Sequence, residues 1–177
     1  EGTETKMSYE IMHGNYPVMA NEVLSKLADQ ELHKLGAESL IYTKEEQEFA
    51  EELYQTLVNA DSQIGDQTII RPMVYSQGKG STDVGDVSWM VPTTGVRVAT
   101  WVPGTSAHSW QAVAAGGTSI GTKGANLAAK ALANTALQLY ENPELIDAAW
   151  EEHRRNVGDH EYNSLLGDRK PPLDYRK

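Results

Sequence analysis

The sequence predicts an α/β fold, because segments with the alternation of a β-strand are followed by segments with the periodicity of an α-helix. Residues 5–12 alternate apolar and polar side chains, and apolar residues at helical spacing follow over 23–35. Residues 94–103 alternate more regularly, and a glycine-rich stretch then leads into helical spacing from Ile120 to Leu139. Each pair is a strand followed by a helix, the arrangement from which α/β domains are built.

The first of these units begins with the strand predicted over residues 5–12. Its apolar face carries Met7, Tyr9 and Ile11. The turn cluster HGNYP follows, and Asn21 is placed to cap the helix after it. Gly36 is placed to end that helix. One strand and one helix cannot close a sheet, so this unit needs further strands.

A second helix is predicted after Thr43, because Thr43 and Glu46 form the S/T-x-x-E capping box. Its apolar stripe comprises Phe49, Leu53, Leu57 and Val58. Residues 59–68 are polar and predict a loop. Residues 69–80 hold a short strand that Pro72 confines to the edge of a sheet.

The last predicted helix begins at Asn142-Pro143, with Asn142 as the cap and the proline in the first turn. Gly158 is placed to end it. Residues 166–177 are basic and contain two prolines, so we expect an extended tail.

Composition excludes several classes of function. The 177 residues carry a net charge of −10, whereas nucleic-acid binders present a basic surface. The absence of cysteine excludes disulfides, thiolate metal sites and a cysteine nucleophile. No run of about 18 apolar residues predicts a membrane span, and the first residues do not resemble a signal peptide. We therefore expect a cytoplasmic protein that binds neither nucleic acid nor membranes.

Two loops next to predicted strands carry groups suited to chemistry. The first is GTSAHSW (104–110), in which His108 could act as a metal ligand or general base. The alternative is a histidine that merely occupies a turn and bonds to the backbone. No HExxH or paired-histidine spacing decides between these two interpretations.

The second loop is GKGSTDVGDVSW (78–89). Its glycines can turn backbone amides toward an anion. The loop also carries hydroxyl and carboxylate groups. These groups belong to Gly78, Gly80, Ser81, Thr82, Asp83 and Asp86. The alternative is a capped turn, since serine, threonine and aspartate all favour turns and helix caps.

Other segments carry no chemical motif. No P-loop is present, and the glycines of GGTSIGTKG do not fit a dinucleotide-binding fingerprint. The remaining histidines lack a partner pattern, and we interpret them as surface or packing residues. They are His13, His33, His153 and His160.

Three motifs together resemble a known family. STDVGDVSW (81–89), VPGTSAHSWQAV (102–113) and GGTSIGTKGANLAAKALANTAL (116–137) are similar to the C-terminal part of the two-metal amidohydrolase and carboxypeptidase family. This family also includes glutamate carboxypeptidase and the indoleacetyl-amino-acid hydrolases. The resemblance extends backward through EEQEFAEELYQTL and YPVMANEVLSKLADQELHKLG and covers nearly all of residues 1–165.

The resemblance implies a site for several residues. His108 matches the last metal-ligand histidine of the family, which binds two divalent ions, zinc or manganese, in the intact enzyme. Ser81, Thr82 and Asp83 match a loop that borders the substrate pocket. Gly116 and Gly117 fall where the family's chain passes close to that pocket.

The resemblance also implies that the chain is incomplete as an enzyme. The family's other metal ligands, its bridging carboxylate and its general-base glutamate lie in an N-terminal half that this sequence does not contain. We therefore expect the C-terminal half of a zinc-peptidase-like α/β catalytic domain over 39–165, preceded over 1–38 by the end of a lid (dimerisation) domain and followed by the tail. We expect no activity and no bound metal for the chain alone.

For the parent protein, the resemblance implies hydrolysis of an amide bond to a glutamate-like residue of a small-molecule substrate. It also implies a homodimer through the lid domain, or a second hydrolase subunit, as partner. One alternative is a non-catalytic binding or assembly subunit of the same fold. Another is an amidase for a different N-acyl amino acid.

Overall fold

The computed structural model describes residues 2–76, 78, 80–168, 170 and 173. Within these ranges the chain folds into six α-helices and two short 3-10 turns, η1 (Glu38–Leu40) and η2 (Asp66–Thr68). The helices are α1 (Glu22–Leu35), α2 (Lys44–Tyr54), α3 (Val84–Met90), α4 (Trp110–Gly116), α5 (Ser119–Glu141) and α6 (Pro143–Val157). None of these helices is long and apolar enough to cross a membrane.

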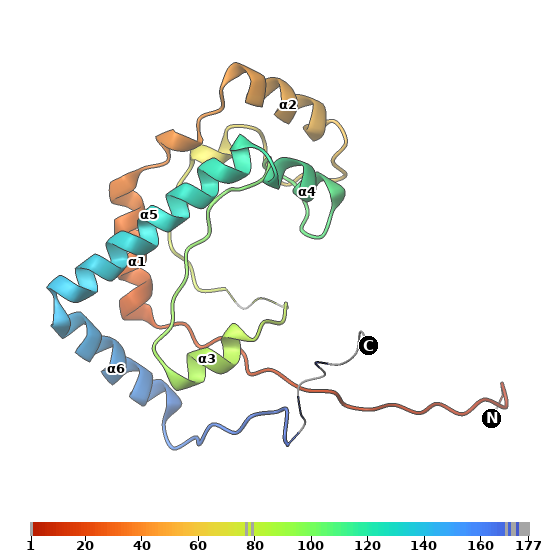
Figure 1. The fold of residues 1–177 in the computed structure, drawn as a ribbon, viewed down its shortest axis with the longest axis vertical. Coiled ribbons are helices and arrows are strands. Elements are labelled where there is room, and N and C mark those ends of the chain that lie inside the picture. The colour runs from red at the N-terminus through yellow and green to blue at the C-terminus, as the bar shows by residue number, and fades with distance from the viewer. Residues whose placement is uncertain (1, 77, 79, 169, 171–172, 174–177) are drawn as a thin grey trace.

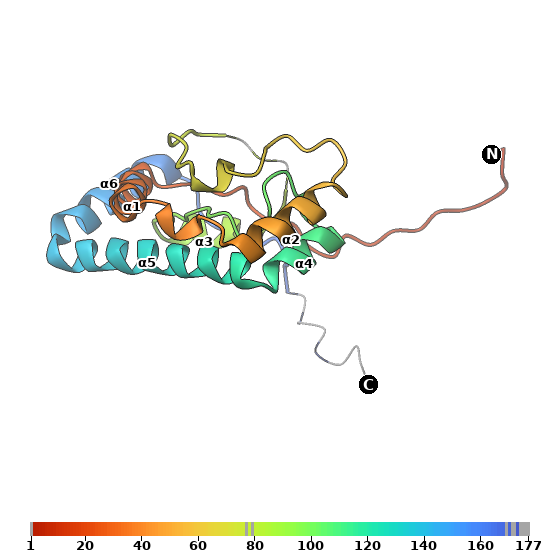
Figure 2. The same cartoon turned by 90° about the horizontal axis from the view of Figure 1, so that it is seen from above.

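The long helix α5 organises the molecule. Helix α1 runs beside α5, and α6 turns back from the end of α5 to pack on α1 (Figures 1 and 2). Helices α2 and α4 lie at the opposite end of α5, whereas α3 lies near the far end of α6 (Figure 1). The start of the N-terminal segment extends away from the helices in both views (Figures 1 and 2), whereas residues 16–19 contact α3.

The start of α1 confirms the predicted cap. The side chain of Asn21 accepts a hydrogen bond from the backbone amide of Leu24 at 3.0 Å and donates one to the carbonyl of Ala149 at 2.9 Å. Asn21 therefore caps α1 and also ties it to α6. Gly36 ends α1 at a φ of 67°, a left-handed value that glycine adopts at little cost.

A second group at the start of α1 comes from α6. The carboxylate of Glu152 accepts hydrogen bonds from the backbone amides of Glu22 at 2.7 Å and Val23 at 2.9 Å. These amides have no partner inside the helix, and the helix dipole favours a negative charge at this end. The contact therefore explains how Glu152 can be buried.

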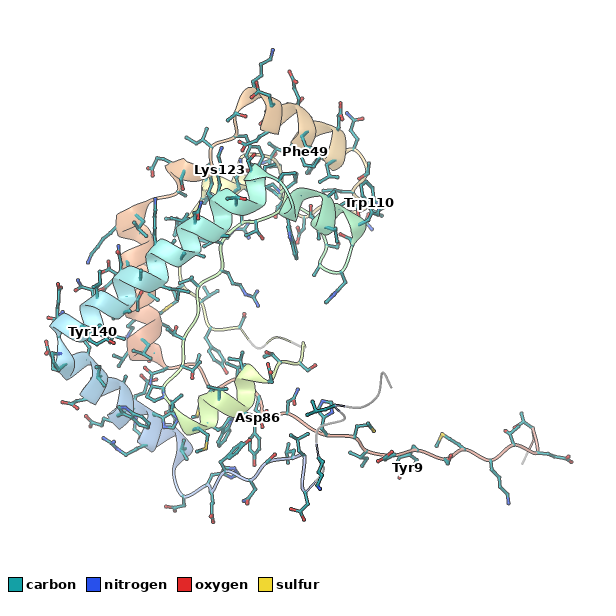
Figure 3. All side chains as sticks on the ribbon, in the orientation of Figure 1. Tyr9, Phe49, Asp86, Trp110, Lys123 and Tyr140 are labelled. Carbon is teal, nitrogen blue, oxygen red and sulfur yellow. The ribbon has the colours of Figure 1, made fainter. Side chains whose placement is uncertain are left out.

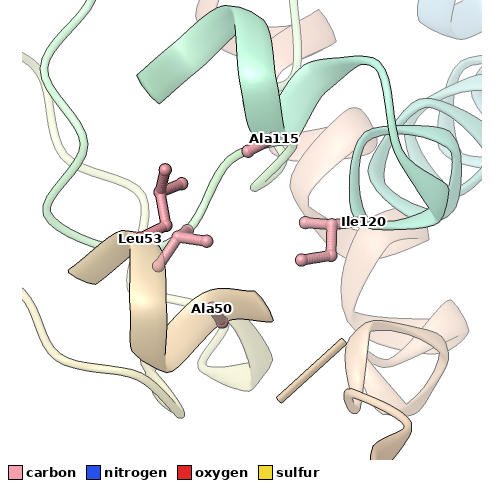
Figure 4. Close-up of a cluster of buried hydrophobic side chains, with 5 residues drawn as sticks. Ala50, Leu53, Ala115 and Ile120 are labelled. Atoms are coloured by element: carbon pink, nitrogen blue, oxygen red, sulfur yellow. The ribbon is translucent and has the colours of Figure 1, made fainter. Parts of the chain in front are cut away.

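One hydrophobic cluster holds α2, α4 and α5 together. It comprises Ala50, Leu53, Val102, Ala115 and Ile120 (Figure 4). The predicted Thr43–Glu46 capping box is present at the start of α2, where it satisfies two backbone amides. Residues far apart in the sequence thus form one core around Val102, the last residue before the Pro103-Gly104 turn.

A second cluster lies along the middle of α5. Ala37, Leu40 and Leu127 are its buried members, with Val98 and Ala99 packed against it. A Cβ atom at Gly124 would collide with the carbonyl oxygen of Ala99. The small residues of α5 therefore allow the helix to lie directly against the extended segment 94–102.

The predicted strands do not form in the part of the chain that the structure describes. Segments 5–12, 69–76 and 94–103 contain no strand, and the one β-contact is an isolated parallel bridge between Ala20 and Thr93. Backbone amides and carbonyls of 95–101 make no backbone hydrogen bond there. A strand exists only through pairing with a neighbour, so alternation without a partner leaves an extended segment. The helical part of the α/β prediction is confirmed, and the sheet part is wrong for this chain by itself.

The predicted extended tail lies partly beyond the described residues. Residues 169, 171–172 and 174–177 are outside them, as are residue 1 of the predicted lid piece and residues 77 and 79 of the predicted edge strand. The described residues 165–168 form a turn.

Candidate functional site

The loop that carries His108 is anchored at both ends. Gly104 has a φ of 82°, and a Cβ atom there would lie 2.7 Å from the Cβ of Ala60, so the position requires glycine. At the other end, the hydroxyl of Ser109 caps α4 by accepting from the amide of Ala112 at 3.2 Å and donates to the carbonyl of Ser106 at 2.7 Å. These contacts fix the turn around His108.

His108 itself has a left-handed backbone and an exposed side chain. Its φ is 58°, which is uncommon for a residue other than glycine. No described residue hydrogen-bonds to its imidazole, so a turn histidine bonded to the backbone is not what the structure contains. Histidine adopts this conformation more often than most residues other than glycine.

The described residues do not provide a metal centre by themselves. Nowhere in the described ranges do three or more histidine, aspartate or glutamate side chains lie close enough to hold one ion. A two-metal site would therefore need ligands beyond His108 and the other described residues.

The loop Ser81–Asp83 is exposed and leads into α3. The hydroxyl of Thr82 accepts a hydrogen bond from the amide of Val84 at 3.3 Å. Asp83 occupies the N-cap position of α3, but its side chain makes no capping bond. These contacts favour the capped-turn interpretation for Thr82 and leave the carboxylate of Asp83 facing solvent.

Helix α3 contains the rest of the STDVGDVSW motif, and two of its residues serve to dock it. A Cβ atom at Gly85 would collide with the carbonyl oxygen of Tyr16, so only glycine allows this approach. The fully buried hydroxyl of Ser88 accepts from the amide of Met19 at 2.9 Å and donates to the carbonyl of Gly85 at 2.6 Å. Both positions of the motif thus have a structural explanation.

Two further contacts complete this docking. The indole N–H of Trp89 donates to the carbonyl of Pro17 at 2.9 Å. The buried ring of His153 on α6 lies with its Nε2 3.1 Å from the carbonyl oxygen of Ser88. His153 is therefore a packing residue, as predicted.

Gly116 and Gly117 lie at the junction of α4 and α5. A Cβ atom at Gly121 of α5 would collide with the carbonyl of Gly116, so the two helices meet through glycine backbones. Gly117 ends α4, and the Thr118 side chain caps α5. Among described residues, no hydrogen bond or ion pair joins these glycines, His108 and Ser81–Asp83 to one another.

The extended segment before His108 borders a groove of about 690 Å³. Consecutive residues from Val96 to Thr105 line it, together with Ala107 and Ala128. The groove therefore runs along the unpaired backbone of this segment and ends at the His108 loop.

An ionic network that the sequence did not predict joins α2 and α5 (Figure 3 labels Lys123). The carboxylate of Glu46, beyond its capping role, accepts from the hydroxyl of Ser119 at 2.6 Å and from the ammonium of Lys123. Burial alone would raise the pKa of Glu46, but the bonds from Lys123, Ser119 and Thr43 outweigh it and hold the pKa below its usual value. No local sequence pattern predicts these long-range contacts.

Comparison with known proteins finds a local match to a hydrolase. Over 75 residues the chain is 43% identical to one of the subunits of the p-aminobenzoyl-glutamate hydrolase of Escherichia coli (strain K12). The match covers 42% of this chain and only 16% of the relative, so the similarity spans a small part of that protein. No family model and no solved structure matches the chain. The chain is thus similar, over that stretch, to part of a hydrolase.

Proposed function

We propose that this chain is part of a metal-dependent amidohydrolase that cleaves the amide bond of p-aminobenzoyl-glutamate or a closely related substrate. The observation that carries the proposal is the 43% identity over 75 residues to the p-aminobenzoyl-glutamate hydrolase polypeptide. The three motifs that resemble the two-metal amidohydrolase and carboxypeptidase family support it, as does the exposed imidazole of His108, which follows Ala107 of the groove lining in the sequence.

In this proposal, His108 is one ligand of a two-metal site whose other ligands lie in a further part of the enzyme. Bound zinc or manganese ions would polarise the amide carbonyl and activate water. The turn between Gly104 and Ser109 fixes the backbone from which the imidazole would reach the metal. The exposed hydroxyl and carboxylate groups of Ser81–Asp83 would contact the substrate.

The 177-residue chain alone would then be inactive, because one histidine cannot hold two ions. A direct test incubates p-aminobenzoyl-glutamate with the chain and Mn²⁺ or Zn²⁺ and measures release of p-aminobenzoate. The proposal predicts no release by the chain and release by the intact enzyme that carries it. Release by the chain alone, or none by the intact enzyme, would contradict the proposal.

A second candidate is a non-catalytic assembly subunit. The observation that favours it is that the relative is itself one subunit of its hydrolase, which is consistent with a protein partner. Metal analysis of the intact protein separates the candidates, since an assembly subunit would contain no stoichiometric divalent ion.

A further inference from the structure

Four rings from three distant segments form an aromatic cluster beside α3. Tyr16 belongs to the N-terminal segment, Trp89 to α3, and His160 and Tyr162 to the segment after α6. Ring centroids lie 5.2 Å apart for Tyr16–Trp89, 5.6 Å for Tyr16–His160, 5.2 Å for Tyr16–Tyr162 and 4.8 Å for Trp89–His160. Tilted and edge-on ring pairs at these separations attract each other beyond simple burial.

Two hydrogen-bond contacts strengthen this cluster. The hydroxyl of Tyr162 donates to Oδ1 of Asp86 at 3.0 Å, and Nε2 of His160 lies 3.3 Å from the hydroxyl of Tyr16. Figure 3 labels Asp86 on α3. The segment after α6 is thereby attached both to the N-terminal segment and to α3.

The hydrogen bond from Tyr162 to Asp86 acts at the start of α3. Asp86 lies in the first turn of this helix, and the helix directly follows the exposed loop Ser81–Asp83. The docking bonds of Ser88 and Trp89 hold the later part of α3. Within the described ranges, Tyr162 is the only side chain outside α3 that hydrogen-bonds to a side chain of its first turn.

We propose that Tyr162 is a positioning residue that holds the Ser81–Asp83 loop in place through Asp86. A hydrogen bond to a charged carboxylate is among the stronger side-chain contacts, and the ring cluster prevents Tyr162 from swinging away. The importance of the loop for substrate rests on the proposed function, but the attachment can be measured without substrate. Burial, the bond to Asp86 and the charge of that carboxylate all raise the pKa of Tyr162.

The test compares Tyr162→Phe, which removes only the hydroxyl, with wild type by amide hydrogen exchange. We expect exchange at Val84 and Gly85, whose amides bond to Thr82, to accelerate about tenfold, since one charged hydrogen bond is lost. Tyr9→Phe is the matched control, because Tyr9 is exposed on the extended N-terminal segment. Unchanged exchange at Val84 and Gly85 in Tyr162→Phe would overturn the proposal.

A second readout follows the phenol itself. In protein with labelled tyrosine rings, Asp86→Asn should lower the pKa of Tyr162 toward its ordinary value near 10, whereas Asp83→Asn should leave it unchanged. If Asp86→Asn leaves the pKa of Tyr162 unchanged, the assignment is overturned, even if Tyr162→Phe loosens the loop. Neither readout needs catalysis, so failure of the hydrolysis assay and failure of this attachment are distinguishable.

Discussion

Glu46 on α2 forms an ion pair with Lys123 on α5, and the carboxylate is buried while the ammonium remains about a quarter exposed (28%). The same carboxylate also caps α2 and accepts from Ser119. One side chain therefore joins the start of two helices next to the cluster around Val102.

Removing the cation leaves this buried carboxylate without a counter-charge. We expect Lys123→Met to lower the free energy of unfolding by about 3 kcal/mol, as when one partner of a buried pair is lost. Urea denaturation measures this value. Lys26→Met is the matched control, because Lys26 and Glu22 form an exposed pair, and there we expect a change under about 1 kcal/mol. Equal effects in the two variants would refute a special role for Lys123.

The lowered pKa of Glu46 makes stability depend on pH in the acid range. A carboxyl whose folded-state pKa lies below the unfolded value of 4.5 stabilises the fold above that pH. This contribution is lost as the pH falls below 4.5 through the folded-state pKa. Thermal unfolding between pH 7 and pH 2.5 should show a shallower acid decline for Glu46→Gln than for wild type. Parallel declines would show that Glu46 does not titrate as described.

Tyr42 carries a buried hydroxyl with no hydrogen-bond partner among the described residues. Tyr42→Phe removes an unsatisfied polar group, so we expect stability at pH 7 to be unchanged or higher by up to about 1 kcal/mol. Burial, and to a lesser degree the nearby charge of Glu46, raises the pKa of Tyr42 to about 12. The folded state favours the neutral phenol, so wild type should lose stability between pH 10 and 12 and Tyr42→Phe should lose less. A loss of several kcal/mol at pH 7 would reveal a hydrogen bond to this hydroxyl.

Gly85 is the position where α3 meets the N-terminal segment. Gly85→Ala would force the backbone of Tyr16 and α3 apart, and we expect a loss of about 2 kcal/mol or more. Gly95→Ala serves as the control, because a Cβ atom there meets nothing within 4 Å. Trp89 lies in the same contact, and a shift of its fluorescence would report the undocking of α3. A stable variant with unchanged fluorescence would contradict the tight approach.

Local patterns predicted several helix ends correctly, because caps act over three or four residues. Asn21, Gly36 and the Thr43–Glu46 box all perform the predicted roles. Asn142 precedes α6 as predicted, but its side chain makes no capping bond, and α2 ends at Tyr54, before the predicted Leu57 and Val58. Helix α3 was not predicted, since its seven residues depend on distant contacts with 16–19 and His153. Strands also depend on distant partners, so the strand predicted from the alternation in 94–103 is only an extended segment in the structure.

In the candidate site, too, local features were predicted from the sequence and long-range contacts were not. The turn around His108 was predicted from its glycine and hydroxyl residues, and the structure adds the left-handed backbone of the histidine. The bond between Tyr162 and Asp86 joins residues 76 positions apart in the chain, which no local motif indicates. The resemblance to a hydrolase came from motifs rather than from any spacing of ligands.

The metal content of the intact enzyme tests the role of His108 most directly. If His108 is one ligand of a two-metal site, His108→Ala should bind about half the zinc or manganese of wild type and release p-aminobenzoate at least about a hundredfold more slowly. His33→Ala is the matched control, because His33 is half-exposed on α1 beside Asp29, and it should retain both metal and activity. Full metal content and undiminished hydrolysis in His108→Ala would contradict the account.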